Sequence, residues 1–225
     1  MNNLFSLLFS VFFVLTIAAQ KDSLQLGDRY ADDQIYAAIT YSQFYNQPST
    51  ISKSGFSYSI STGFIKDFIL NKNGTFSFAA GVGYGFDFFN HQLKVEEINN
   101  TPILSSDNSL VSNKFKSHNF EFPLEFRWRT STANNYKFWR VYTGIKFVYN
   151  FSNKFEFTDS NNNSFSYSNI SSYNKLQYGL TLSAGYDAFN IHLFYGLTPL
   201  FESTIDGVEK VGTKILKFGL IFYIL

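Results

Sequence analysis

The feature of this sequence that most constrains its fold is a regular alternation of large apolar and polar residues. In the segment NFEFPLEFRWRTS, residues 119–131, every second residue from Phe120 to Trp128 is large and apolar, and Glu, Pro and Arg stand between them. Successive side chains of an extended chain point to opposite faces, whereas a helix would scatter both sets around its axis. The segment is therefore predicted to be a β-strand with one aromatic face and one charged face.

The same alternation occurs eight times after a polar lead at about residues 20–32. The eight expected strands are residues 34–42, 55–64, 75–89, 119–131, 138–152, 175–187, 190–202 and 214–225. A few residues depart from the pattern, either as apolar residues on the polar face or as prolines without a ladder donor. They are Phe194, Leu200, Ile215, Ile221, Pro123 and Pro199.

The connections between these strands alternate in length. Residues 92–116 and 159–172 are expected to be long polar loops, and residues 45–54 and 203–213 are intermediate. Short turns are expected near residues 71–74, 132–136 and 188–190. Long loops at one end and tight turns at the other are typical of an outer-membrane barrel, and an even number of strands returns the chain to the periplasm.

The composition decides which face of the strands meets which environment. Aromatic residues make up 20% of the chain and charged residues only 16%, against about 25% charged in a soluble domain. A lipocalin-like soluble barrel would carry long charged residues on its polar face, but here that face is mainly Gly, Ser, Ala and Thr. Small residues suit the narrow interior of an eight-stranded barrel. The predicted fold is all-β, an eight-stranded antiparallel transmembrane β-barrel of the outer-membrane type.

The charged residues of the strands are expected to point into the lumen of this barrel. A basic side chain that faces lipid at mid-depth costs roughly 2–4 kcal/mol, and buried charges persist when they are paired. Five basic and five acidic residues share the inward phase and are predicted to form a lumen charge network. They are Arg127, Arg129, Arg140, Lys146, Lys217, Asp87, Glu121, Glu125, Asp187 and Glu202.

The N-terminus predicts export. Residues 4–17 are an apolar run that ends in Ala18 and Ala19, and a run of this length is too short for a spanning helix of roughly 20 residues. We therefore expect a signal peptide at residues 1–19, cleaved near Ala19 and Gln20. Residues 20–225 would then form a single barrel domain with a short periplasmic lead, located in the outer membrane of a Gram-negative cell. The chain has no cysteine, which excludes disulfides and thiol chemistry.

No residue pattern indicates catalysis, a cofactor or a metal. The three histidines are His91, His118 and His192, and none has a Ser or Asp at a spacing that suggests a nucleophile–base–orienter set. His192 falls on the inward phase, where an interior imidazole is expected. The glycines of GVGYG, residues 81–85, lack the spacing and the helix of a nucleotide-binding loop. The net charge of +1 argues against nucleic acid as a partner. No small-molecule substrate is expected.

Four segments of the sequence resemble one known family. HNFEFPLEFRWRTS is followed by FWRVYTGIKFVYNF, then by LSAGYDAFNIHLFYGLTPLF and by the terminal LKFGLIFYIL. Together these segments are similar to the PorT family of outer-membrane β-barrels, called SprT in gliding bacteria, and the resemblance covers roughly residues 29–225. The set as a whole carries the resemblance, and no single segment does.

The resemblance implies an integral outer-membrane component that type IX protein secretion, and gliding where present, requires. Its partners would be outer-membrane lipid and other type IX secretion components. It implies no catalytic residues for this chain, so the expectation is a non-catalytic interaction or assembly element. Two alternatives stay open at this point: a small outer-membrane channel, and a lipid-modifying outer-membrane enzyme.

Overall fold

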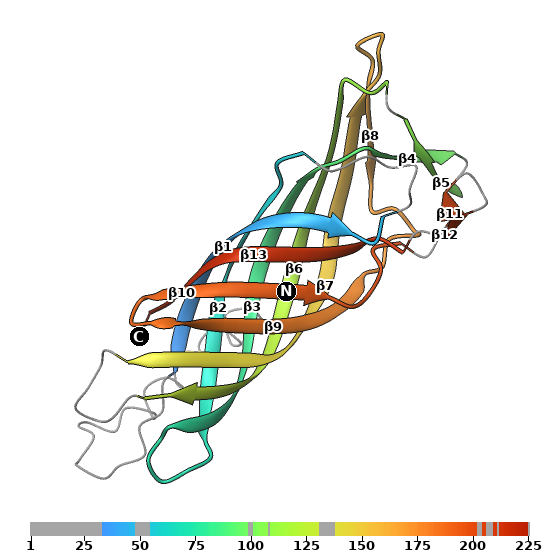
Figure 1. The fold of residues 1–225 in the computed structure, drawn as a ribbon. Helices are drawn as coiled ribbons and strands as arrows, with labels where there is room; N and C mark the ends of the chain where they lie inside the picture. The colour runs from blue at the N-terminus through green and yellow to red at the C-terminus, as the bar shows by residue number, and fades with distance from the viewer. Residues whose placement is uncertain are drawn as a thin grey trace, which may run out of the picture.

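The computed structural model describes residues 33–47, 55–98, 101–107, 109–130, 138–201, 204–205, 209–210 and 212–224, and within these ranges every regular element is a β-strand (Figure 1). Eight strands form the body: β1 (Gln34–Tyr45), β2 (Tyr58–Ile69), β3 (Phe76–Asn90), β6 (Ser112–Arg129), β7 (Trp139–Thr158), β9 (Leu176–Tyr186), β10 (Phe189–Gly196) and β13 (Lys214–Ile224). The five short strands are β4 (Leu93–Ile98), β5 (Thr101–Ser106), β8 (Ser164–Ser168), β11 (Thr204–Ile205) and β12 (Glu209–Lys210). None of the described residues forms a helix long and apolar enough to cross a bilayer.

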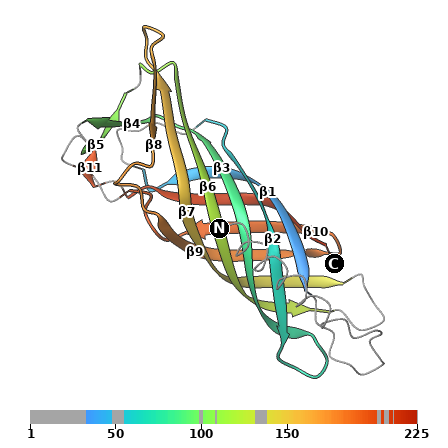
Figure 2. The same cartoon turned by 180° about the vertical axis from the view of Figure 1, so that it is seen from behind.

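The eight body strands close into a barrel. Their order is β6-β3-β2-β1-β13-β10-β9-β7, and β6 pairs with β7 to complete the ring. Each of these pairings is antiparallel, and the first strand pairs with the last from Ile35↔Ile224 to Tyr45↔Lys214. Figure 2 shows the strands crossing the barrel obliquely from the other side. The predicted eight-stranded antiparallel barrel is confirmed, and closure leaves these eight strands no open sheet edge within the bilayer.

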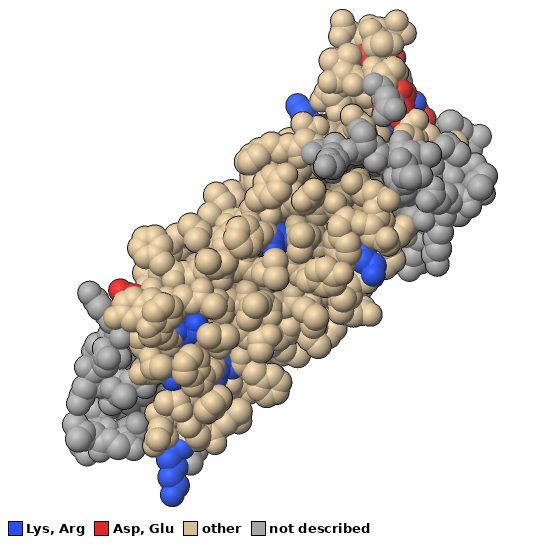
Figure 3. All heavy atoms as spheres, in the orientation of Figure 1, with Lys and Arg blue, Asp and Glu red and all other residues tan. Residues whose placement is uncertain are grey.

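The registers sort the alternating residues into an outer and an inner surface. One row of directly paired residues crosses five strands, and all of its members point outward and are wholly or partly exposed: Trp128, Val141, Ala184, Ile191 and Leu220. Neighbouring rows are similarly apolar, and uncharged residues cover most of the face in Figure 3. An apolar exterior of this extent around a closed sheet is the surface that lipid solvates.

The two ends of the barrel differ. The connections β1–β2, β3–β6, β7–β9 and β10–β13 lie at one end, called here the long-loop end, and β2–β3, β6–β7 and β9–β10 lie at the other, the short-turn end. At the short-turn end Gly74 (φ 70°) closes the turn after Asn71, and Asp187 (φ 55°) stands between β9 and β10. Both have the left-handed backbone that Gly adopts readily and Asp tolerates. The turn expected near 132–136 lies outside the described residues.

The long-loop end carries more regular structure than the sequence predicted. Residues 92–116 were expected to be a polar loop, but they form the hairpin β4–β5 and the first residues of β6. The expected loop 159–172 contains β8, which pairs with the projecting part of β7. A second sheet of order β12-β11-β5-β4 forms beside this projection. The prediction was wrong because Leu93, Val95 and Leu104 are apolar residues spread through polar stretches, and all three are buried.

An apolar cluster, called here the cap, fills the barrel at the long-loop end. Its side chains come from β1, β3, β6, β7 and β13, from the β4–β5 hairpin, and from residues between the other strands. They are Phe44, Phe89, Leu93, Val95, Leu104, Phe115, Phe155, Ile170, Tyr173, Leu200, Phe201 and Ile215. The cap explains why Leu200 and Ile215 broke the alternation, because both belong to it. Phe194 and Ile221 are likewise buried inside the barrel.

The two irregular prolines mark interruptions of the sheet. Pairing of β3 with β6 stops after Ala80↔Leu124 and resumes at Gly83↔Glu121 in the same register, so the ladder is interrupted beside Pro123. Proline has no N–H to donate there. Strand β10 ends at Gly196, before Pro199, which makes it shorter than the predicted segment 190–202.

Candidate functional site

The candidate site is the charged lumen of the barrel. Eight of the ten predicted lumen residues are buried inside it: Asp87, Glu121, Glu125, Arg127, Arg129, Arg140, Lys146 and Lys217. Asp187 instead lies half-buried in the turn between β9 and β10. Glu202 lies outside the described residues, as does the expected signal peptide at residues 1–19. The lumen also contains Asp67, which sequence reasoning missed.

Asp67 is the centre of the ion pairs near the short-turn end. Its carboxylate lies 2.8 Å from Arg129 Nη1 and 3.7 Å from Arg127 Nη1, and it accepts a hydrogen bond of 2.6 Å from Ser77 Oγ. Arg127 Nε donates to Glu125 at 2.9 Å, and Arg129 Nε donates to the Gly74 carbonyl at 2.9 Å. Two guanidinium groups are thus held by two carboxylates in a buried site, where charge-assisted hydrogen bonds are strong.

The signal for Asp67 was present in the sequence. Ile65 and Asp67 continue the inward phase of β2, and Phe64 and Phe68 continue its outward phase. Lys66 lies between the two phenylalanines on the outward phase. The strand predicted from the sequence ended before this lysine, at residue 64. In the structure Lys66 lies at the end of the barrel and is exposed, where it pairs with Asp33 at 2.9 Å.

In the middle of the lumen Lys146 pairs with Glu121. The distance from Lys146 Nζ to Glu121 Oε2 is 2.9 Å, and the Tyr36 hydroxyl donates to the same oxygen at 3.3 Å. A Cβ atom at Gly83 would collide with the Tyr36 hydroxyl, and one at Gly85 would lie 2.9 Å from Glu121 Oε1. Gly83 and Gly85 are therefore inward positions where a larger side chain would displace the Tyr36–Glu121 contact.

Nearer the cap, Asp87 and Lys217 form the third buried pair. Lys217 Nζ lies 2.6 Å from Asp87 Oδ1, and Asn119 donates to Asp87 Oδ2 at 2.9 Å. Asn150 and Asn153 extend this hydrogen-bonded chain towards the cap. The pairs of Asp67 and Asp87 join strands that are not neighbours in the barrel, β2 to β6 and β3 to β13, whereas the Glu121–Lys146 pair joins the adjacent strands β6 and β7.

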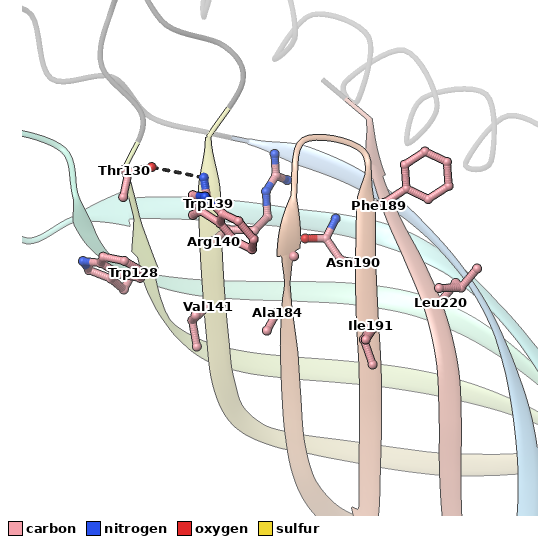
Figure 4. A pocket seen from close by; sticks show the side chains of 11 residues that line it. Trp128, Thr130, Trp139, Arg140, Val141, Ala184, Phe189, Asn190, Ile191 and Leu220 are labelled. Carbon is pink, nitrogen blue, oxygen red and sulfur yellow. Dashed lines mark hydrogen bonds between the residues drawn. The ribbon is translucent and has the colours of Figure 1, made fainter.

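Arg140 differs from the other lumen cations. It is 5% exposed, and no ion pair holds it among the described residues. Its guanidinium lies over the ring of Phe138 at 4.5 Å, and over those of Tyr223 and Tyr142 at 5.4 and 5.9 Å. Figure 4 shows this side chain extending towards the short-turn end, beside the turn that joins β9 to β10.

The histidines occupy three different environments. His192 Nδ1 lies 2.8 Å from Ser183 Oγ inside the lumen, and Tyr223 donates to the same hydroxyl at 3.3 Å. This contact could not be predicted from the spacing of the two residues in the sequence. It arises because Ser183 and His192 are paired across β9 and β10. Among the described residues no carboxylate forms a hydrogen bond or ion pair with His192, so this part of the structure lacks the orienting acid of a hydrolytic triad. His118 contacts the hydroxyl of Tyr84 at 2.6 Å towards the outer surface.

His91 lies in the cap, beyond the membrane-spanning part of the barrel. It follows β3 and donates its backbone N–H to the Asn113 carbonyl. At this level of the barrel β6 and β7 carry outward, partly exposed charged residues, namely Lys116, Lys154 and Glu156. The rings of Phe44, Phe115 and Phe155 surround it. Burial among them lowers the pKa of His91 to about 3, so the imidazole is neutral.

Metal-binding geometry is absent from the part of the chain that the structure describes, where no group of three His, Asp or Glu side chains could hold an ion. Glu96 and Glu97 were expected in a solvated loop, but both belong to β4, and Glu96 pairs with Lys94 at 3.1 Å.

A shallow depression of about 660 Å³ lies at the short-turn end, and its walls are almost wholly apolar (Figure 4). Its outward side chains include Trp128, Trp139 and Ile191, and Ala184 is the small residue among them. It continues the lipid-facing surface, and the inward residues Arg140 and Asn190 also line it.

The family model described as outer membrane protein beta-barrel domain matches residues 18–202 of the chain. No curated protein sequence matches it. Among solved structures, it is similar to the crystal structure of Ail, the attachment invasion locus protein of Yersinia pestis, with 18% identity, 88% of this chain and 100% of that chain covered, and a TM-score of 0.34.

Proposed function

The chain belongs to the outer membrane protein beta-barrel domain family, and on that premise we propose that it is an occluded, non-catalytic barrel that serves type IX protein secretion as an interaction or assembly element. The family places the barrel in the outer membrane. The secretion role rests on the resemblance of four sequence segments to the PorT family. The closed lumen supports a role that does not depend on transport through the barrel itself.

The observation that carries the proposal is the ion-paired interior. Three groups of buried pairs centred on Asp67, Glu121 and Asp87 follow one another along the lumen, and the apolar cap covers the long-loop end. Beside Tyr36, Pro123 and His192 the free space is only about 10 Å³, which is close to the least volume that holds one water. This filling of the described part of the lumen supports a barrel without a continuous aqueous path.

If the lumen is closed, the surfaces left for partners are the outside and the ends. The long-loop end carries two sheets that project beyond the lipid-facing band, including β4, β5 and β8. The aromatic exterior offers a second surface to membrane-embedded partners. The periplasmic lead at residues 20–33 would meet components below the membrane.

The secretion role is tested by deleting the gene and comparing the proteome of the culture medium with that of the complemented parent. We expect proteins with a type IX C-terminal signal to disappear from the medium and to accumulate in the periplasm. A complementing copy that lacks β4–β5 should insert normally but restore secretion poorly. Unchanged secretion in the deletion strain would refute the role in secretion, whatever the state of the lumen.

The closed lumen is tested separately by planar-bilayer recording of the purified barrel. We expect no stable conductance from the wild type. The variant Lys146→Ala/Glu121→Ala, which removes the central pair, should show at most rare openings. Robust ion flow through the wild-type barrel would overturn the occluded state and favour a small channel.

A further inference from the structure

The charges of the described lumen do not balance. Its four carboxylates each hold a cation: Asp67 holds Arg129, Glu125 holds Arg127, Glu121 holds Lys146 and Asp87 holds Lys217. Arg140 is a fifth cation at the same inner surface, and within the described ranges no carboxylate lies within ion-pair distance of it. One buried positive charge is therefore left over.

The surroundings of Arg140 compensate this charge only in part. Nε and Nη1 of its guanidinium are buried and donate to no partner in the described structure. The rings of Phe138, Tyr142 and Tyr223 supply cation–π contact, but a ring face does not accept the directional hydrogen bonds that guanidinium N–H groups form. Arg127 lies over the same two tyrosine rings, at 4.5 Å from Tyr142 and 5.7 Å from Tyr223. A second cation so close raises the positive potential around Arg140.

One carboxylate adjoins the site without pairing with it. Asp187 in the β9–β10 turn donates its backbone N–H to the Phe138 carbonyl at 3.1 Å, but it forms no ion pair with Arg140 in the structure. Arg140 is the second residue of β7 and the last inward position of that strand at the short-turn end (Figure 4). It is level with its partner Arg129 on β6, and the buried Phe138 lies beyond it. Arg140 is therefore nearer to the short-turn end than the ion pairs of Glu121 and Asp87.

From this geometry we infer that the short-turn end of the lumen is an oxyanion-binding site, in which Arg140 binds a phosphate or carboxylate group that enters from the periplasm. The planar guanidinium offers two adjacent N–H donors, which is the arrangement that binds two oxygens of one such group. The aromatic rings hold the guanidinium in place. The bound anion would balance the fifth lumen cation.

The first test uses the purified full-length barrel in an uncharged, phosphate-free detergent. Inorganic phosphate is compared with chloride at equal ionic strength, and thermal unfolding and isothermal titration calorimetry are the readouts. At a phosphate concentration about tenfold above Kd, the unfolding equilibrium constant of the wild type should fall about elevenfold. Arg140→Gln should lose both the stabilisation and the calorimetric signal. Lys72→Gln, which removes an exposed cation from a turn at the same end, should keep both.

Two further variants keep the test decisive. Arg140→Lys retains the charge without the planar fork, so it should fold and bind phosphate more weakly than the wild type. Asp187→Asn removes the one described carboxylate adjoining the site and should bind phosphate at least as tightly as the wild type. A response to short-chain phosphatidylglycerol but not to phosphate would assign the oxyanion to a lipid headgroup. The proposed oxyanion site would be contradicted if the wild type and Arg140→Gln responded equally to both probes, or if the wild type responded to neither.

Discussion

At the scale of single residues, the inside of this barrel is organised by carboxylates that each hold a specific cation. Asp67 is the clearest case, because it holds two arginines and a serine at once. A buried pair of this kind adds little net stability over a well-packed apolar pair, but removing one partner leaves an uncompensated charge. The lumen therefore tolerates few single changes among its charged residues.

Asp67→Asn should destabilise the barrel by about 3–5 kcal/mol, because Arg127 and Arg129 would lose a shared carboxylate in a dry site. The measurement is the urea midpoint of the refolded protein in detergent. Lys66→Gln is the matched control, since the Lys66 side chain is 58% exposed and its pair with Asp33 should contribute less than about 1 kcal/mol. Equal midpoints for the two variants would contradict the importance of the buried pairs.

Gly83→Ala should cost about 1–3 kcal/mol, because the added methyl group overpacks the lumen. Its Cβ would collide with the Tyr36 hydroxyl and lie 2.7 Å from the Thr62 carbonyl oxygen. Ala80→Val on the same strand points outward and should be close to neutral, which makes it the control. If both variants unfolded at the wild-type urea concentration, the close approach of Tyr36 to Gly83 would be wrong.

At the scale of elements, β6 and β7 are the longest strands and carry structure beyond the lipid-facing band. Their upper parts, together with β4, β5 and β8, build the walls of the cap around His91. Burial there depends on contacts between segments far apart in the chain. We expect the cap to open while the lower barrel stays folded, because the cap lies beyond the ion pairs of the lumen.

The cap should loosen at low pH. An unfolded histidine has a pKa of about 6.5, whereas the pKa of His91 in the folded cap is about 3. Between these values the opened cap binds a proton that the closed cap does not, so closure is most stable above about pH 6.5 and weakens as the pH falls towards 3. Hydrogen exchange of β4 and β5, corrected for the intrinsic pH dependence, measures this.

His91→Phe is the control for the pH effect, because phenylalanine fits among the same rings and carries no proton. In this variant the protection of β4 and β5 should no longer depend on pH between 4 and 7. A pH dependence identical to that of the wild type would assign the effect to another group.

The eight barrel strands could be predicted from the sequence, while the cap and the ends of the charge network could not. Alternation with a period of two persists wherever one face of a strand meets lipid, so β3, β6 and β7 could be predicted from the sequence alone. Beyond the lipid there is no such contrast, so Leu93 and Val95 looked like members of a polar loop. Eight lumen charges could be predicted from their inward position in the alternation. Asp67 was missed because the predicted strand ended before the exposed Lys66 next to it. Asp187 does not point into the lumen because it lies in a turn.

At the scale of the whole molecule, the protein is an apolar cylinder with a polar interior and two unlike ends. The short-turn end has the shorter connections, and the long-loop end has the projecting part of the barrel sheet with β8, the second sheet and the cap. This asymmetry determines what each side of the membrane can contact. In the proposed orientation, the projecting sheets face the exterior of the cell.

The orientation can be tested because the chain contains no cysteine of its own. Asn161→Cys lies in the exposed turn after β7 at the long-loop end, and Lys72→Cys lies in the β2–β3 turn at the other end. A membrane-impermeant maleimide should label the first variant on intact cells and both variants after lysis. Labelling of Lys72→Cys alone on intact cells would reverse the proposed orientation.

The pair between Asp87 and Lys217 has a consequence for how the protein is made. These residues are 130 positions apart, and β13, which carries Lys217, follows the other seven barrel strands in the chain. Until β1 meets β13, the lumen is the open face of a curved sheet, and every basic residue on that face would cost roughly 2–4 kcal/mol in contact with hydrocarbon. Insertion strand by strand into bare lipid is therefore disfavoured. The inner face of the unclosed sheet has to stay hydrated, or shielded by the machinery that inserts it, until β1 has paired with β13.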